Sequence, residues 1–529
     1  MNIKRLLPSL AILVIFILAT FGLERMPPLW WDEGWTISVA RNWVEDGFYG
    51  HYLNGQPAAP QLAGGFPVVV PVALSFRLLG VGVWQARLPS VIFLFASLIL
   101  LYTLAHQLYN RQVAAGAIAA ALLMSVGPWL NPLIIGRQVL GETPVTFYLL
   151  AGYAFLLLSL RRSAWFILPA ILFWAIAVRT KAQVPPFWLA SLLLPLAIAI
   201  LKRWHRPAIL LIVAITGTHL LADYGINRLQ ISILSGHTVW GTPMKELFSI
   251  TALVLNGKVR LDALSTVLTF GLPTLLGLGY AAWKALGIDL THPPSPLPSL
   301  LGRGGRGVRS DTSTLRLALL GLAGSWLAWY ALLGMSWVRY LFVPIFVGSL
   351  FVSALLYELT GHFNLRQTIH RAASLLLRRS SLRQSGGALL AVILVSVTVP
   401  FNLLTFDLIY DYVSYNPWAR PAAEQVADYI NANTPAGALI ETFDSEMLFF
   451  LERKVHYPPG DLQVAAVRRL DFQEEVPLTY DPLVADPDYV VLGHFSRTWE
   501  IYDAAIASGA FREIATFPGY QIFERVRSP

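Results

Sequence analysis

The chain contains no cysteine, which excludes disulfide bonds, thiolate metal sites and a cysteine nucleophile. Charged residues are also scarce: they make up 13% of the 529 residues, against roughly 25% in soluble globular proteins. Apolar residues reach 55%. Such a chain needs a solvent other than water over much of its surface. The composition therefore excludes a disordered chain and an ordinary cytosolic enzyme, and it predicts a multi-pass membrane protein.

Nucleotide-binding signatures are missing as well. The chain has neither a GxxxxGK[ST] sequence nor a GxGxxG sequence that follows a strand. We therefore expect neither an ATP-driven pump nor a transferase with a nucleotide-sugar Rossmann domain. The net charge is +8, and in a membrane protein such a surplus belongs on cytoplasmic loops, so no nucleic-acid partner is expected.

Long apolar runs are abundant. The first, 6–23, follows Lys4 and Arg5 and lacks a small-residue cleavage site, so we expect an uncleaved first helix. Later runs long enough to cross the bilayer bring the expected number of spans to about eleven: 88–108, 112–128, 143–160, 164–178, 183–201, 207–224, 263–283, 315–334, 339–358 and 387–405. The apolar segment 66–80 is short and contains two prolines, so it is expected to lie at the membrane interface.

Basic residues indicate how the chain is oriented in the cytoplasmic membrane. With the N-terminus inside, the expected cytoplasmic loops hold nearly every dense cluster of Arg and Lys: 109–112, 161–163, 202–206, 284–314 and 359–386. An odd number of spans then places the C-terminal region outside. The loop 284–314 is rich in Pro, Gly, Ser and Arg and is expected to be flexible, and membrane lipids are expected partners.

Charged and turn-forming residues return after residue 405, and no later run could cross a bilayer. The predicted elements there are, in chain order, a helix over 420–435, strands over 438–443 and 489–492, a helix over 501–514 and a strand over 520–526. Their alternation is typical of an α/β domain. The predicted fold is mainly α: a transmembrane helical bundle with interfacial helices over 1–405, and a small extracytoplasmic α/β domain over 406–529.

The sharpest local feature is an acidic pair in the expected outer loop 24–87. Asp32 and Glu33 follow the first span and lie among three tryptophans. Adjacent residues cannot face one direction on a regular helix, so one carboxylate is expected to face a site and the other to pack or pair. Desolvation near the bilayer makes a carboxylate more basic, which suits a general base. The alternative is a pair of solvated loop charges beside an aromatic belt.

Further charges lie at span ends on the same expected side. In the second outer loop, 129–142, Arg137 and Glu142 could pair with each other, or Arg137 could orient a donor phosphate while Glu142 supplies a second carboxylate contact. Lys181 and Arg339, the latter followed by Tyr340, stand against the positive-inside trend. An anionic lipid phosphate would be a partner for such cations, and snorkelling to head groups is the alternative.

Further polar and charged residues lie on the expected outer side of the membrane. Arg179 shares the outer position of Lys181. His219, Asp223 and His237 have no known metal-site spacing, so no metal and no other cofactor is expected, with a divalent ion left open. In the outer domain, a set of charges is either an acceptor contact or ordinary surface charge: Asp444, Glu446, Glu452, Arg453 and His456.

The order of these motifs resembles the GT-C type membrane glycosyltransferases, which use lipid-phosphate sugar donors. The acidic pair after the first span and a second acid in the next outer loop carry the likeness. It is strongest to the bacterial branch related to dolichyl-phosphate-mannose protein mannosyltransferases and the lipid A aminoarabinose transferase. The similar segments are VWQARLPSVIFLFASLILLYTLAHQLYN (83–110), GRQVLGETPVTFYLLAGYAFLL (136–157), RTKAQVPP (179–186) and WVRYLFVP (337–344).

The resemblance implies a role for each matched residue. Asp32 would be the catalytic base, supported by Glu33, and Glu142 matches the second acidic position. The donor phosphate would be held by residues from three loops: Arg137, Lys181, Arg339 and Tyr340. Two positions depart from the aminoarabinose-transferase-like pattern. Trp35-Thr36 stand where that branch has an Arg, and Gly64-Gly65-Phe66-Pro67 stand where it has a Lys before Pro-Pro-Leu, so the substrate is expected to differ.

The implied reaction moves a sugar from a polyprenyl-phosphate donor to a lipid, glycan or protein acceptor on the outer face of the membrane. Asp32 would deprotonate the acceptor while cations stabilise the departing phosphate, and an in-line displacement would invert the anomeric centre. The alternative is a transporter or flippase of lipid-linked sugars. That class typically carries ionisable residues within its spans and internal repeats, and this chain shows few of the former and no obvious repeat.

Overall fold

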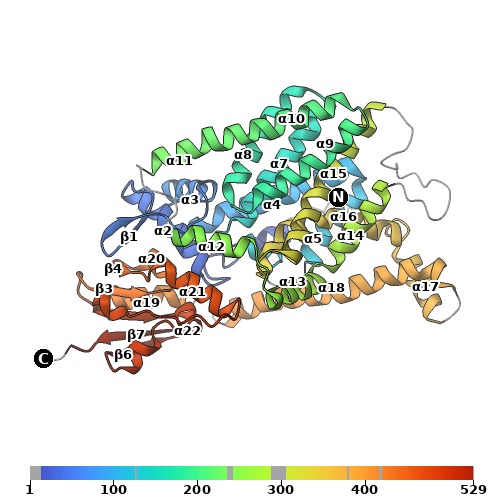
Figure 1. The fold of residues 1–529 in the computed structure, drawn as a ribbon. Helices are drawn as coiled ribbons and strands as arrows, with labels where there is room; N and C mark the ends of the chain where they lie inside the picture. Colours follow the sequence, from blue (N-terminus) through green and yellow to red (C-terminus); the bar gives the residue numbers. More distant parts are fainter. Residues whose placement is uncertain are drawn as a thin grey trace.

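The computed structural model describes residues 13–125, 127, 129–234, 242–286, 306–377, 380–415 and 420–527. A helical bundle makes up most of the molecule, and a small α/β domain lies at one end of it (Figure 1). Both parts of the predicted fold, the bundle and the C-terminal α/β domain, are confirmed.

The bundle consists mainly of long helices: α4 (Val83–Leu108), α5 (Arg111–Leu123), α7 (Glu142–Arg161), α8 (Ile167–Thr180), α9 (Val184–Leu201), α10 (His205–Leu220), α13 (Gly257–Phe270), α14 (Leu272–Leu286), α15 (Arg306–Leu332), α16 (Phe342–Leu359) and α18 (Leu382–Tyr415). Shorter segments extend or join them: α6 (Pro132–Ile135), η1 (Ala164–Phe166), η2 (Leu221–Ile226), α11 (Asn227–Ile233), α12 (Thr242–Ala252), η3 (Val338–Leu341) and α17 (Leu365–Leu376).

Each expected span has a helical counterpart, but the lengths differ. Within the described ranges, seven helices are long and apolar enough to cross a membrane, or eight if α13 and α14, which meet at a bend of 79°, form one broken span. Two further expected spans, α5 and η1–α8, are shorter apolar helices. The first expected span is helical over residues 13–20, and its earlier part lies outside the described residues.

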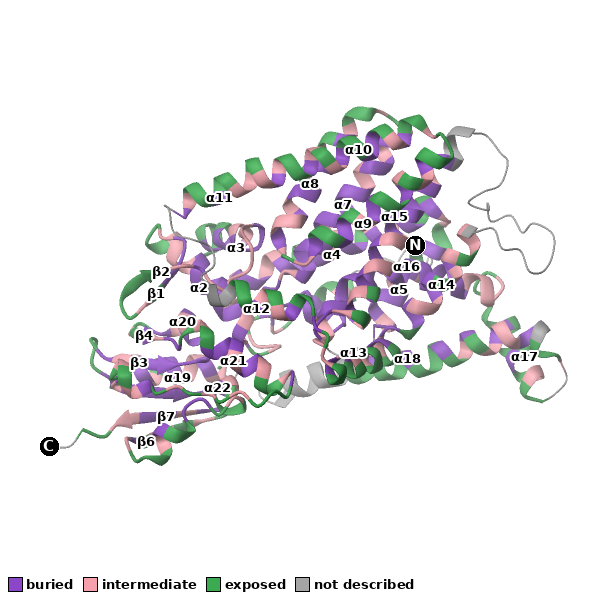
Figure 2. Ribbon diagram, in the orientation of Figure 1, coloured by how far each residue is buried: buried purple, intermediate pink, exposed green. Residues whose placement is uncertain are grey.

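The bundle has a buried centre and a periphery of helices with exposed residues on their outer faces (Figure 2). Every residue of α16 from Phe342 to Leu356 is buried. By contrast, α10 and α18 expose aliphatic side chains such as Ile209, Ile212 and Leu404 on their outer faces. Exposed apolar faces around a buried core are what a helix bundle in hydrocarbon requires, so the described chain is a multi-pass membrane protein.

A small layer of short helices and strands covers the end of the bundle nearest the α/β domain (Figure 1). It contains α2 (Trp31–Glu45), the hairpin β1 (His51–Leu53) with β2 (Gln56–Ala58), and α3 (Phe66–Leu79). The helix α3 corresponds to the apolar segment that was expected to lie at the interface. Its residues Val68, Val72 and Phe76 pack with α2 in one apolar cluster.

The C-terminal domain is a five-stranded sheet in the order β4-β3-β5-β7-β6, with β3 parallel to β4 and β5, and β7 antiparallel to β5 and β6. Its elements are α19 (Ala422–Asn433), β3 (Leu439–Thr442), α20 (Met447–Phe450), β4 (Lys454–His456), α21 (Gly460–Leu470), η4 (Pro482–Ala485), β5 (Tyr489–Leu492), α22 (His494–Thr498), α23 (Asp503–Ala507), β6 (Phe511–Phe517) and β7 (Tyr520–Arg525).

Four of the five elements predicted in this domain are confirmed, and the helix over 501–514 is wrong in its second half. Only α23 is helical there, because Gly509 adopts a positive φ of 75° and ends the helix, and β6 follows. The expected domain boundary at 405/406 falls inside α18, which continues to Tyr415.

The expected cytoplasmic and outer elements lie at opposite ends of the molecule. In Figure 1, α17 lies at the end of α18 farthest from the C-terminal domain, while α2 and α3 lie beside that domain. The expected flexible loop 284–314 is only partly described: α14 ends at Leu286, and the part from Arg306 onward is not a loop but the first turns of α15.

Candidate active site

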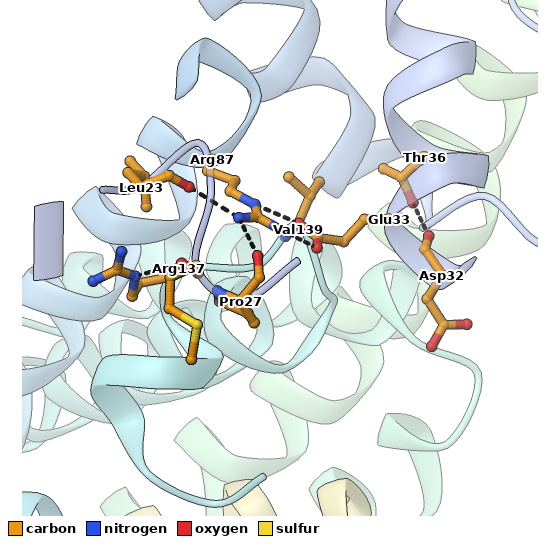
Figure 3. Close-up of polar contacts among 9 residues, drawn as sticks. Leu23, Pro27, Asp32, Glu33, Thr36, Arg87, Arg137 and Val139 are labelled. Carbon is orange, nitrogen blue, oxygen red and sulfur yellow. Dashed lines mark hydrogen bonds and ion pairs between the residues drawn. The ribbon is translucent and has the colours of Figure 1, made fainter. Parts of the chain in front are cut away.

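The acidic pair begins α2, and its two side chains diverge. Asp32 and Glu33 occupy the first helical turn, where the positive end of the helix dipole favours carboxylates. In Figure 3, Glu33 points inward to Arg87, whereas Asp32 points away from that pair. This divergence confirms the expectation that adjacent carboxylates on one helix face different surroundings.

Glu33 is part of a fully buried network. Its carboxylate accepts from Nε and Nη2 of Arg87 at 2.9 and 2.5 Å, and from the backbone N–H of Val139 at 2.8 Å. Nη1 of Arg87 donates to the carbonyls of Leu23 and Pro27 (Figure 3). Both charged side chains have no exposed surface. Glu33 therefore ties α2 to α4 and to the second outer loop, and it is a positioning residue.

Arg137 is also used inside the fold. It is fully buried, and its guanidinium donates to the carbonyls of Met26, Leu18 and Phe21 at 2.8, 2.8 and 2.5 Å. The side chain has no exposed surface, and three of its five N–H groups donate to carbonyls at the end of the first helix. The expected contact between Arg137 and a donor phosphate does not fit this geometry, and we assign Arg137 to anchoring that helix end.

The remaining candidates come together in one cluster. Asp32 forms an ion pair with Arg339, and Lys181 Nζ lies 2.5 Å from Glu142 Oε1. Tyr340 joins the two pairs, because its ring lies 5.3 Å from Lys181 Nζ and 5.7 Å from the Arg339 guanidinium carbon. The side chains of Asp32, Arg339 and Lys181 are 21, 18 and 18% exposed. We call these five residues the outer charge cluster.

Aromatic rings fix the position of Arg339. Its guanidinium carbon lies 5.3 Å from the ring of Trp30 and 5.7 Å from that of Trp337. Stacked cations are held in one orientation without being neutralised. Trp30 also contacts Trp129 and Phe495, whose ring centroids lie 5.6 and 6.1 Å away. The cluster therefore lies beside an aromatic wall built from the bundle and the C-terminal domain.

Arg179 and its neighbours lie apart from these contacts. Arg179 is bonded to Asn227 and lies 3.9 Å from Asp223, which pairs with His219 at 3.0 Å. His237 lies outside the described residues. In the described part of the chain, no three His, Asp or Glu side chains gather as a metal site requires.

Two of the C-terminal charges, which the sequence allowed to be either acceptor contacts or ordinary surface charges, are interior groups. Asp444 is buried and accepts from the N–H groups of Gly493 and Phe495 and from the Ser496 hydroxyl at 2.8, 2.9 and 2.6 Å. Glu446 is buried and accepts from the Tyr520 hydroxyl at 2.6 Å. Such groups serve the fold rather than a surface, whereas Glu452 remains exposed.

Stability is expected to fall as the pH rises toward 8 because of Glu446. Burial, together with the charge of Asp444, raises the pKa of Glu446 from 4.5 to about 8. Below 4.5 the group is neutral in both states. Between 4.5 and 8 only the unfolded chain ionises, so stability is lost over that window. Thermal unfolding midpoints of the purified protein should decline across it, and Glu446→Gln should flatten the decline. An equally flat profile for the exposed control Glu452→Gln would contradict this assignment.

Arg87 was missed as a functional position by the sequence analysis, although a usable signal was present. It lies next to the start of the expected span 88–108 on the expected outer side, against the positive-inside trend. The same criterion singled out Lys181 and Arg339. If this criterion had been applied to every basic residue on the expected outer side, Arg87 would have been identified as a cation that needs a partner.

Comparison with known proteins identifies the fold. No family model matches the chain, and no curated relative matches its sequence. ArnT from Cupriavidus metallidurans is similar over 99% of both chains, with a TM-score of 0.58 and 14% identity. The same protein bound to undecaprenyl phosphate gives a TM-score of 0.57 at 14% identity over 98% of both chains.

A second similar structure is the oligosaccharyltransferase AglB from Archaeoglobus fulgidus, in complex with an inhibitory peptide and a dolichol-phosphate. It has a TM-score of 0.52 and 13% identity, over 98% of this chain and 74% of that one. At sequence identities this low, the structural similarity establishes the architecture alone. The chain has the GT-C type fold that the order of its motifs predicted.

Proposed function

We propose that this protein is an integral membrane glycosyltransferase that moves a sugar from a polyprenyl-phosphate donor to an acceptor on the outer face of the cytoplasmic membrane. The observation that carries the proposal is the outer charge cluster. It places one carboxylate, Asp32, against the partly exposed Arg339, and the Tyr340 ring joins this pair to the partly exposed Lys181 and its partner Glu142. The cluster lies at the end of the bundle that also bears α2, α3 and the C-terminal domain.

The two ion pairs are what we expect of a phosphate-binding site in its ligand-free state. Each cation is paired with a carboxylate, Arg339 with Asp32 and Lys181 with Glu142, so neither charge is left uncompensated at a low-dielectric boundary. A phosphate supplies oxygens that accept charge-assisted hydrogen bonds from both cations. Once the phosphate binds Arg339, Asp32 loses its partner and becomes free to accept a proton.

This exchange links donor binding to base activation. Asp32 then removes the proton from the acceptor nucleophile as that nucleophile attacks the anomeric carbon. Arg339 and Lys181 stabilise the negative charge that grows on the departing phosphate. A direct in-line displacement of the phosphate by the acceptor inverts the anomeric configuration, and this is the stereochemistry that we propose.

The similar structures support a lipid-phosphate donor. The undecaprenyl phosphate in ArnT and the dolichol-phosphate in AglB are both polyprenyl-type phosphates, and both are held by proteins of this architecture. Function does not follow from fold alone, so the proposal depends on the cations of the cluster.

One of the two departures from the aminoarabinose-transferase-like pattern, the one at Gly64-Gly65-Phe66-Pro67, has a structural reason. At Gly65, an added Cβ would lie 2.6 Å from the carbonyl oxygen of Arg179 and 2.8 Å from that of Thr180. No side chain fits there without moving the backbone that leads into Lys181. We infer that Lys181 supplies the cation that the branch supplies from the interfacial helix.

Replacing either cation should weaken binding of the lipid phosphate. For Lys181→Ala and Arg339→Ala we expect the affinity of the purified protein for undecaprenyl phosphate to fall about tenfold or more, since each loses a charge-assisted hydrogen bond. The measurement is a binding titration in nanodiscs. Lys258→Ala, which removes an exposed lysine of α13, is the matched control and should bind as the wild type does. Unchanged affinity in both cluster variants would contradict the assignment.

A further inference from the structure

The two reactive halves of the outer charge cluster come from segments far apart in the chain. Asp32 lies on α2, and Arg339 lies on η3, 307 positions later. The C-terminal α/β domain contacts the segment directly ahead of each one. These contacts are buried or half-buried, and they involve side chains with defined hydrogen-bond partners.

The first contact holds the start of α2. The indole N–H of Trp31 lies 2.9 Å from both the carbonyl of Phe443 and the hydroxyl of Tyr457. In return, the hydroxyl of Ser445 donates to the carbonyl of Trp31. The indole N–H and the backbone carbonyl of Trp31 are therefore both bonded to the C-terminal domain, one residue before Asp32.

Backbone packing makes this contact close. Gly34 lies on the face of α2 that meets the loop 443–446, where an added Cβ would lie 2.4 Å from the backbone nitrogen of Glu446 and 2.5 Å from the carbonyl carbon of Ser445. Backbone atoms cannot swing aside as a flexible side chain can. Glycine at position 34 thus lets the helix that carries Asp32 lie directly on the domain.

The second contact holds the segment ahead of Arg339. The side chain of Trp337 interacts with the carboxyl group of Asp471 and favours its ionised form, whereas burial raises the pKa of that group. Trp337 in turn packs against the guanidinium of Arg339 and the ring of Tyr340, at 5.7 and 5.5 Å. Next to Asp471, the carbonyl of Phe472 accepts from the side chain of Asn256 at 2.9 Å, which attaches this edge of the domain to α13.

We propose that the C-terminal domain sets the distance between the catalytic base and the phosphate-binding arginine, by holding Trp31 through Ser445 and Trp337 through Asp471. This inference rests on the proposed function of Asp32 and Arg339. Ser445 and Asp471 are positioning residues, because neither touches the reacting groups. We call the segments around Trp31 and Trp337 the two arms. They contact each other through the Asp32–Arg339 ion pair and the stacking of Arg339 on Trp30, and the C-terminal domain acts as a further brace across them.

The brace predicts a different defect for each arm. Ser445→Ala loosens the arm of Asp32, so turnover at saturating donor should fall, by about 10²-fold if the base shifts by about 1 Å, while the affinity for undecaprenyl phosphate stays the same. Asp471→Ala loosens the arm of Arg339, so that affinity should fall as well. Asp471→Asn keeps an oxygen that accepts from Trp337 and should restore wild-type binding. General destabilisation would not separate the two parameters in this way.

The experiment uses the full-length protein in nanodiscs and three measurements on each variant: hydrogen exchange of peptides covering 31–39 and 336–342, affinity for undecaprenyl phosphate, and sugar turnover. Exchange should rise about tenfold in 31–39 for Ser445→Ala and in 336–342 for Asp471→Ala. Trp31→Phe, which keeps an aromatic ring smaller than the indole but removes the N–H, provides a second test of the first arm. The controls are Ser508→Ala and Asp461→Ala. The hydroxyl of Ser508 bonds only to nearby backbone groups, the carbonyl of Ala505 and the N–H of Ala510, and Asp461 is exposed.

Unchanged exchange in both arms overturns the brace. Raised exchange with unchanged turnover and affinity also overturns it, since the contacts would then hold no reactive group in place. Failure of the proposed function has a different signature: the wild-type protein itself would neither bind undecaprenyl phosphate nor transfer sugar, whatever the exchange of the two arms.

Discussion

Replacing Asp32 with asparagine is expected to lower sugar transfer about 10²–10⁴-fold, because a general base contributes a factor of this size. The amide keeps the size of the side chain and an oxygen that can accept from Arg339, but it cannot take a proton. Asp32 is partly exposed, so the protein should insert and fold as before. Turnover of a defined polyprenyl-phosphate sugar by the purified variant is the measurement.

The control for this variant is undecaprenyl phosphate binding. Asp32→Asn should bind the lipid phosphate at least as tightly as the wild type, because the phosphate no longer competes with a carboxylate for Arg339. Transfer at the wild-type rate by Asp32→Asn would show that another group removes the proton, and the base assignment would be wrong.

Glu33→Gln, one position further along the same helix, should destabilise the protein instead. It leaves the Arg87 guanidinium buried without a counter-charge, and breaking such a pair costs about 3–5 kcal/mol. Arg87→Met, which strands the carboxylate, should have an effect of similar size. The measurement is the free energy or midpoint of unfolding of the purified protein in detergent.

A double variant separates pairing from other effects. In Glu33→Leu with Arg87→Met both charges are gone, and apolar replacements of a buried pair are often neutral, so much of the lost stability should return. Complete recovery is not expected, because the N–H of Val139 and the carbonyls of Leu23 and Pro27 lose their partners. Additive losses in the double variant would contradict direct pairing.

Most of the fold could be predicted because hydropathy is a local property. Every long apolar run is helical over most of its described residues, since a chain in hydrocarbon must satisfy its backbone hydrogen bonds internally. The bend of 79° between α13 and α14 was missed, because apolar composition is the same on both sides of Gly271. The strand β6 was also missed: its alanine-rich approach favours helix, and only pairing with β7 decides its conformation.

The sequence predicted which residues are candidates for the site, but it did not predict which of them pair with each other and which are interior. The expected side of the membrane and the scarcity of charge selected six residues, and Tyr340 was added as the neighbour of Arg339. Five of these seven form the outer charge cluster. Sequence could not show that Glu33 and Arg137 are interior, because a buried arginine that binds carbonyls looks like an exposed one. The partner of Asp32 lies 307 residues away, and no local spacing encodes such a pair.

The C-terminal domain was the least predictable part of the site. Residues 438–456 were interpreted as elements of an independent domain, since nothing in their own pattern refers to α2 or η3. The contacts of Ser445 with Trp31 and of Asp471 with Trp337 arise only when the two domains pack together. Contacts of this kind depend on tertiary structure, so they cannot be predicted from a single sequence.

The central claim is that this protein breaks the bond between a sugar and a polyprenyl phosphate. Its most direct test places the purified protein in liposomes with a synthetic polyprenyl-phosphate sugar labelled in the sugar ring, adds cell-envelope acceptors, and follows the label by mass spectrometry. The account predicts that free polyprenyl phosphate appears together with a labelled acceptor, and that Asp32→Asn yields neither. If the labelled lipid instead crosses the bilayer intact, with no free polyprenyl phosphate, the protein is a transporter and the account is wrong.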